Sequence, residues 1–264
     1  MTTDNLNQIR HYLKILKLAR MEKALDEELS QASQKGRATS ETLLRLLAAE
    51  ADTLIERRIE RRIKESKLPE RKLLADFDFK FQTGIDKSQI MELATLGFIE
   101  RKQGLIMAGD AGTGKSHLVK ALLLLACQKR YRCRYTSAAA MLKDLYAGLA
   151  DYSLERKLKT YTAPEVLVID DVGLDRLEQN DARNAALFLK VIDGRYCKGT
   201  TIMTTNIDFE ALGHYLGDPL ITTSIVDRMI HHSIIISVQG PSWRMHESQR
   251  LNSQPQKQQK NPSR

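Results

Sequence analysis

The stretch "GDAGTGKS", residues 109–116, decides the fold of this 264-residue chain. It fits G-x-x-x-x-G-K-[ST], a loop whose backbone amides cradle phosphate groups. Its glycines lack a Cβ atom, so the backbone can curl and bring N–H groups onto phosphate oxygens. In such loops the lysine reaches the β- and γ-phosphates and the hydroxyl binds Mg²⁺. The residues expected around the phosphates are Gly109, Asp110, Ala111, Gly112, Thr113, Gly114, Lys115, Ser116 and His117.

The segments beside the loop distinguish a phosphate site from a chance glycine-rich turn. A phosphate-binding loop follows a strand and opens a helix. Before it stands "GLIMA", a short apolar run typical of a buried parallel strand. After it, Leu118, Ala121, Leu122 and Leu125 recur with helical spacing. Both flanks favour the phosphate site.

The composition is that of a soluble globular protein, with 42% hydrophobic and 28% charged residues. No apolar run approaches the roughly 20 residues of a membrane span, and the first residues hold no apolar signal segment. Three widely spaced cysteines favour a reducing cytoplasm. No cysteine or carboxylate spacing completes a zinc site around His231 and His232, so we expect no structural metal. We therefore expect a cytoplasmic protein without a membrane partner.

The net charge of +8 lies mainly at the two ends of the chain. Residues 1–75 hold 16 Lys and Arg against 12 Asp and Glu, and residues 228–264 hold 6 against 1. Residues 76–227 are nearly balanced, with 19 against 20. Basic ends suit a nucleic-acid backbone, although a solvated basic surface gives the same pattern.

The first 70 residues are expected to form a helical domain for self-association or DNA binding. Residues 5–34 read as one amphipathic helix that Gly36 ends. A second helix starts near Thr39 or Ser40 and closes before Pro69. It carries an apolar stripe of Ile55, Ile59 and Ile63 beside an arginine stripe. The arginine stripe suits DNA or an acidic partner, or alternatively Glu–Arg pairs along a solvated helix. The candidate DNA contacts are Arg57, Arg58, Arg61, Arg62 and, further on, Lys143.

The remainder divides into a linker at 71–87, an α/β domain at 88–250 and a polar, disordered tail at 251–264. Helical and apolar segments alternate in the α/β domain, which predicts a parallel sheet. The "RYRCRYT" segment alternates polar with less polar residues and therefore indicates an edge strand. The expected strands are 104–108, 131–136, 165–170, 200–205 and 233–238.

Two of these strands end in polar residues that suit phosphate chemistry. "VLVIDD" at 166–171 has the form of a Walker B strand. Asp170 can hold the Mg²⁺ that Ser116 also contacts, and Asp171 can orient the attacking water. A simple Asp-containing turn is the alternative. "TIMTTN" would place Asn206 near the γ-phosphate, although Asn is also common where strands end.

Two arginines follow in the last third of the chain. Arg228 is expected on a short helix, and Arg244 lies in "PSWRM". Either could form an ordinary surface ion pair. The order P-loop, Walker B, Asn, Arg, Arg strengthens the functional interpretation.

That order resembles the AAA+ ATPases, in the branch containing the initiator DnaA and the helicase loader DnaC. The sequence is most similar to the IstB family, ATP-binding helpers of insertion-sequence transposition. The stretches that carry this resemblance are "MEKALDEEL", "ERRIERRIKESKLPERKLLADFDF", "DFDFKFQTGIDKSQIMELATLGFIERKQGLIMAGDAGTGKSHLVKAL", "VLVIDDVG", "TTN" and "IVDRMIHHSIIISVQGPSWRM". The resemblance covers about residues 5–248. It implies a P-loop AAA+ fold with a five-stranded parallel sheet flanked by helices and a short C-terminal lid.

The resemblance also implies the roles of the site residues. Lys115 and Ser116 match Walker A, and Asp170 matches the carboxylate for Mg²⁺. Asp171 matches the catalytic carboxylate, where many AAA+ proteins carry Glu. Asn206 matches the first sensor, Arg228 an arginine finger and Arg244 the second sensor. Residues 137–160 lie where this branch inserts a helix used on DNA.

The leading hypothesis is an ATP- and Mg²⁺-dependent ATPase that oligomerises on double-stranded DNA, shares its ATP sites between subunits and recruits a transposase. A DnaC-like helicase loader acting on single strands is the alternative within the fold. Two further alternatives are a small P-loop kinase and a DNA-binding scaffold that binds ATP without useful hydrolysis.

Overall fold

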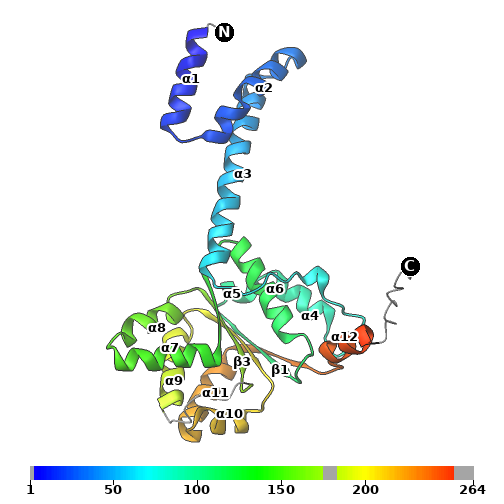
Figure 1. Cartoon of the computed structure of the whole chain (residues 1–264), viewed down its shortest axis with the longest axis vertical. Coiled ribbons are helices and arrows are strands. Elements are labelled where there is room, and N and C mark those ends of the chain that lie inside the picture. Colours follow the sequence, from blue (N-terminus) through cyan, green and yellow to red (C-terminus); the bar gives the residue numbers. More distant parts are fainter. Residues whose placement is uncertain (1–2, 175–182, 253–264) are drawn as a thin grey trace, which may run out of the picture. The chain divides into compact units, whose positions relative to one another are not determined.

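The computed structural model describes residues 3–174 and 183–252 in two compact units, Met1–Arg61 and Arg62–Arg264 (Figure 1). The boundary falls within the helix α3 (Thr39–Glu65). The domain boundary expected after residue 70, and the linker expected at 71–87, therefore both lie inside the second unit. Residues 253–264 of the expected tail lie outside the described residues. In the part described, no helix combines the length and the apolar character that a membrane span requires.

The first unit contains two helices where the sequence predicted one. The helix expected over 5–34 is interrupted between α1 (Thr3–Ile15) and α2 (Ala19–Lys35). Lys17 adopts a positive φ of 58°, and the Leu18 amide donates to the Leu13 carbonyl. In one straight helix, Leu13 and Leu25 would stand roughly 18 Å apart. The reversal instead brings both into one buried cluster with Met21 and Leu46.

The ends of these helices agree in part with the sequence prediction. Gly36 caps α2 in the left-handed conformation, and its amide donates to the Ala32 carbonyl. α3 begins at Thr39 and ends at Glu65, short of Pro69. Ile63 of its expected apolar stripe is buried, but Ile55 is 43% exposed. The stripe is therefore not covered along its whole length within the described residues.

The second unit is built on five parallel strands in the order β2-β3-β4-β1-β5, which confirms the predicted sheet. The predicted edge position of "RYRCRYT" is also confirmed, because β2 pairs only with β3 among the residues that the structure describes. The strand itself begins two residues later than expected, at Cys133. The strands are β1 (Gly104–Gly109), β2 (Cys133–Ser137), β3 (Val166–Val172), β4 (Thr200–Thr205) and β5 (Ser233–Val238).

Helices flank this sheet, as Figure 1 shows. α6 (Lys115–Gln128) follows the phosphate loop and packs against strands β1 to β4. The other elements are η1 (Leu74–Asp76), α4 (Lys87–Ala94), α5 (Gly97–Glu100), α7 (Ala138–Ala150), α8 (Leu154–Thr162), α9 (Arg183–Arg195), α10 (Phe209–Leu216), α11 (Pro219–His231) and α12 (Trp243–Asn252).

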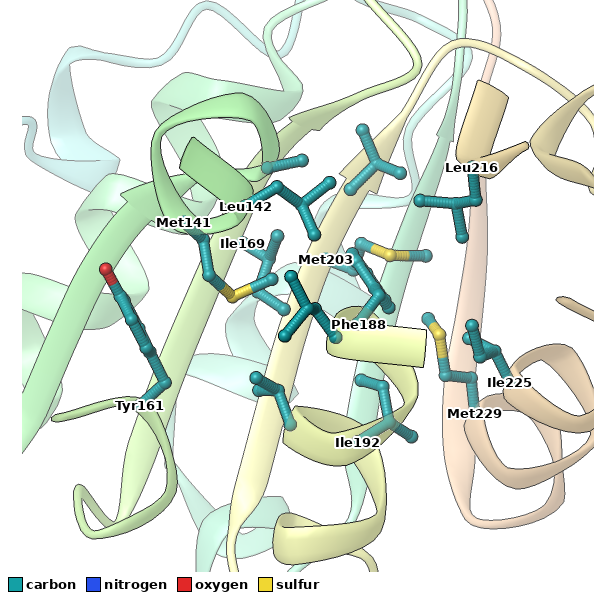
Figure 2. Packing of buried hydrophobic residues seen from close by; sticks show 14 of the residues in the cluster. Met141, Leu142, Tyr161, Ile169, Phe188, Ile192, Met203, Leu216, Ile225 and Met229 are labelled. Atoms are coloured by element: carbon teal, nitrogen blue, oxygen red, sulfur yellow. The ribbon is translucent and has the colours of Figure 1, made fainter. Parts of the chain in front are cut away.

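A large hydrophobic cluster joins the sheet to α7, α8, α9, α10 and α11 (Figure 2). Phe188 of α9 is fully buried in it, beside Ile169 of β3 and Met203 of β4. Burying such a side chain contributes about 1.5–3 kcal/mol. This packing fixes β3 and β4 side by side, so the polar residues at their carboxyl ends lie together.

Candidate functional site

The phosphate loop joins β1 to α6 in the way the sequence predicted. Gly112 and Gly114 have positive φ values of 82° and 95°, which side chains rarely tolerate. A Cβ on Gly114 would also lie 2.6 Å from the Phe77 ring, and one on Gly112 would overlap the Ser242 hydroxyl. Glycine is therefore required at both positions by conformation and by space.

Lys115 stands at the start of α6 with its ammonium directed back to the loop. Its Nζ donates to the carbonyls of Gly109 and Asp110, each at 2.7 Å. The side chain is buried, and this burial lowers the pKa of its ammonium below the ordinary lysine value, with Arg244 acting in the same direction. Asp171, Asp110 and Asp170 oppose that shift. A positive charge is thus held at the loop, against the carbonyls of Gly109 and Asp110.

Ser116 and Asp170 meet, although 54 residues separate them in sequence. The Ser116 Oγ donates to Asp170 Oδ1 at 3.0 Å. The same oxygen accepts from the Thr204 hydroxyl, and Oδ2 accepts from the Tyr135 phenol. Hydroxyl and carboxylate oxygens are hard ligands of the kind that Mg²⁺ prefers. These residues therefore fit Mg²⁺, which would be held by Asp170 and Ser116.

The strand β3 is distorted where it reaches the site. Its register with β4 shifts between Ile169 and Val172, and Asp171 between them adopts a positive φ of 58°. The Asp171 amide donates to the Thr204 Oγ1 at 2.9 Å. Bulges re-aim side chains, and strained backbone persists where its surroundings hold it. Here the bulge accompanies an Asp171 side chain that lines a cavity beside the phosphate loop.

A cavity of about 510 Å³ collects most of the expected nucleotide site. Asn206, just after β4, lines it as expected from the sequence, and so does Arg244. The predicted residues that line it are Ala111, Gly112, Thr113, Gly114, Lys115, Ser116, His117, Asp171, Asn206 and Arg244.

The segment expected to be a linker forms one wall of this cavity. Phe77 and Phe81 line it together with Trp243 from the start of α12. The rings of Phe81 and Trp243 meet edge to face at 5.0 Å, and the Trp243 amide donates to the Gly112 carbonyl. The sequence motifs alone did not assign these aromatic residues to the site. The alternating "FDFKF" at 77–81 was the available signal, because a flexible linker needs no regularly spaced aromatic residues.

Arg228 lies elsewhere. It is on α11, where its Nε pairs with Asp193 of α9 and its Nη1 donates to the Ser224 carbonyl at 2.9 Å. It does not line the cavity that contains Lys115, as far as residues 3–174 and 183–252 show.

The candidate DNA contacts divide between the two units. Arg57, Arg58 and Arg61 are exposed on the part of α3 in the first unit. Arg62 begins the second unit and pairs with Glu65 at 3.6 Å. Lys143 is exposed on α7.

Comparison with known proteins identifies the family of this chain. The family model described as IstB-like ATP binding protein matches residues 11–251. The chain belongs to this family. A relative in Geobacillus stearothermophilus, named as an ATP-binding protein of insertion sequence IS5376, is 36% identical over 96% of this chain and 99% of its own length.

Solved structures share the fold of this IstB-like protein. The structure of DnaI has a TM-score of 0.53 with 20% identity, and the match covers 64% of this chain and 92% of that one. A DnaA structure described as bound to AMPPCP and single-stranded DNA has a TM-score of 0.51 with 18% identity, over 70% of this chain and 56% of that one. The resemblance to the IstB family and the P-loop AAA+ fold expected from the sequence are confirmed.

Proposed function

We propose that this protein is a Mg²⁺-dependent ATPase that assembles on double-stranded DNA and recruits or stimulates the transposase of an insertion sequence. One arrangement carries the proposal: Lys115, Asp171, Asn206 and Arg244 line one cavity, while Arg228 lies outside it. The insertion-sequence relatives support the transposition context.

In the proposed reaction each side chain has a distinct task. Lys115 and the loop amides bind the phosphates, and Asp170 with Ser116 holds Mg²⁺. The metal would neutralise charge that develops on the phosphate oxygens. Asp171 accepts a proton from the attacking water or orients it, and Asn206 helps to position that water. Because Asp is one methylene shorter than Glu, hydrolysis should be slow until the site tightens.

Arg228 completes the site from a neighbouring subunit in this proposal. An arginine supplied from outside stabilises the transition-state charge. A monomer would then bind ATP but hydrolyse it poorly. Exposed apolar residues on α1 and α3, among them Ile15 at 61% and Leu44 at 67%, are consistent with self-association.

Light scattering with ATP, with ADP and with DNA tests the proposal. We expect a mass that grows with the length of double-stranded DNA when ATP is present and falls with ADP. A fixed ring that prefers single-stranded DNA would favour the DnaC-like loader. A monomer under all conditions that phosphorylates a metabolite would favour the kinase. DNA-length assemblies without ATP hydrolysis would favour the scaffold.

A further inference from the structure

The carboxylate of Asp170 is held by hydroxyl groups on both of its oxygens. Ser116 and Thr204 donate to Oδ1, whereas the Tyr135 phenol donates to Oδ2. Asp170 has no exposed surface, so water cannot easily replace a hydroxyl donor that is removed. The loss of such a donor therefore costs free energy. The orientation of this carboxylate therefore depends on Tyr135. This residue belongs neither to the P-loop nor to the pair Asp170 and Asp171 of β3.

Tyr135 has a second connection, through its backbone. It lies on the edge strand β2, and its amide donates to the carbonyl of Ser66 at 2.7 Å. Ser66 directly follows α3 and is fully buried. Its hydroxyl donates to the Ile63 carbonyl at 2.7 Å, which fixes the last turn of the helix. The end of α3 is thus hydrogen-bonded to the residue whose phenol holds Asp170.

The ring of Tyr135 adds a third contact. The ammonium of Lys120 lies 5.8 Å from the ring centroid, and Lys120 also lines the nucleotide cavity. The side chain is therefore restrained between the helix after the phosphate loop and the carboxylate. A phenol restrained in this way can fix the direction in which Oδ1 faces Ser116.

We propose that Tyr135 is a positioning residue that orients Asp170 for Mg²⁺ and couples this site to the end of α3. The proposal rests on the proposed use of Mg²⁺ and ATP. A displacement at the end of α3 would move the Tyr135 backbone and, through the phenol, the carboxylate. Coupling of this kind is reciprocal, so Mg²⁺ and ATP at the site would also steady the end of α3.

The substitution Tyr135→Phe tests the first half, because it removes the hydroxyl and keeps the ring. Binding of a fluorescent ATP analogue is titrated with Mg²⁺ and repeated in EDTA. We expect unchanged affinity in EDTA and a rise of about tenfold in the Mg²⁺ concentration for half-maximal effect, as loss of a hydrogen bond to a charged group implies. Unchanged Mg²⁺ dependence would overturn the proposal.

Tyr161→Phe is the matched control. The Tyr161 phenol donates to the Asp144 carboxylate at 2.9 Å, outside the nucleotide cavity. Tyr161→Phe therefore removes the same type of hydrogen bond. The Mg²⁺ dependence of nucleotide binding by this variant should equal that of the wild type. An equal rise in both variants would show a general loss of structure rather than positioning. If the wild type itself binds no nucleotide, the proposed function fails instead.

Hydrogen exchange tests the coupling, first in the wild type and then in the two variants. In the full-length wild type, Mg²⁺ with a non-hydrolysable ATP analogue should slow amide exchange in residues 62–68 and at Tyr135 relative to the analogue in EDTA. Tyr135→Phe should lose the slowing at 62–68, and Tyr161→Phe should keep it. Unaltered exchange at 62–68 in the wild type, despite measured binding, would overturn the coupling.

Discussion

Arg228 and Asp193 form an ion pair between α11 and α9, and this pair directs the arginine to a surface other than the nucleotide cavity of its own chain. The Arg228 side chain is 34% exposed. It is anchored by the Asp193 carboxylate and by the Ser224 carbonyl, yet part of its side chain remains accessible. Such an anchored, accessible arginine suits a site contributed by another subunit.

Mixing two inactive variants should therefore restore ATPase activity. Arg228→Ala keeps the phosphate loop, and Lys115→Ala keeps the arginine. Interfaces with one intact half from each would be active, and a finger of this kind contributes on the order of 10³-fold in rate. Phosphate release from mixtures measures the effect. Failure of co-assembled mixtures to regain activity would show that Arg228 does not act between subunits.

Lys115→Ala should abolish ATP binding. The ammonium donates to the loop carbonyls of Gly109 and Asp110, so its removal takes away a positive charge at the loop and leaves the hydrophobic core in place. Calorimetry would measure the affinity, and circular dichroism would verify that the fold persists. Lys190→Ala, on α9 and outside the cavity, is the control. Wild-type affinity in Lys115→Ala would refute the assignment of the loop.

Asp171→Asn should separate binding from hydrolysis. Asp170 and Ser116 remain able to hold Mg²⁺, so Mg²⁺-ATP affinity should stay within a few-fold of the wild type. Without the carboxylate, turnover should fall by about 10²-fold or more, because an amide cannot accept the proton. Assemblies on DNA should then persist. Hydrolysis at the wild-type rate would favour the scaffold hypothesis.

Residues with a local pattern could be predicted, and residues held by long-range contacts could not. The glycine spacing of 109–116 predicts a phosphate loop, and the apolar run before Asp170 predicts a strand that ends in a carboxylate. Each pattern lies within a few consecutive positions. Tyr135 and Thr204 meet Asp170 only because β2, β3 and β4 are neighbours. Their spacing in sequence carries no such information, so the sequence predicts only that they lie on strands.

The errors have related physical causes. The leucines before and after Lys17 keep a helical spacing, and neither Gly nor Pro marks the reversal there, so the sequence pattern predicts one helix where the structure has two. Residues 71–87 contain little regular structure and resemble a linker by pattern. Their place in the fold is set by Phe77 and Phe81 at the nucleotide cavity, a contact formed with distant residues.

Arg195→Met should destabilise the second unit. Arg195 is 1% exposed, and burial lowers its pKa to about 10. Its guanidinium donates to several carbonyls that Met would leave without a donor, each at a cost of about 1–3 kcal/mol. Its main acceptors are the carbonyls of Tyr161, Pro164 and Thr200 and the hydroxyl of Thr201.

Urea unfolding measures this prediction. We expect the free energy of unfolding to fall by about 3 kcal/mol or more, the sum of several unpaired carbonyls. Lys198→Met is the control, since Lys198 is exposed three residues later. Equal stability of Arg195→Met and the wild type would mean that water or neighbouring groups replace the lost donors.

DNA binding should depend steeply on salt and little on base sequence. Each neutralised phosphate adds about 0.9 to the slope of log affinity against log salt for duplex DNA. Replacing Arg57, Arg58 and Arg61 by Gln should lower that slope by about one for each phosphate that is no longer neutralised, and Lys143→Gln should lower it by about one.

Fluorescence anisotropy over a salt series measures the slope. Lys198→Gln, which removes a single positive charge elsewhere, should leave it unchanged. A slope that is the same in all variants, or strong preference for one sequence, would contradict binding through the phosphate backbone at these positions.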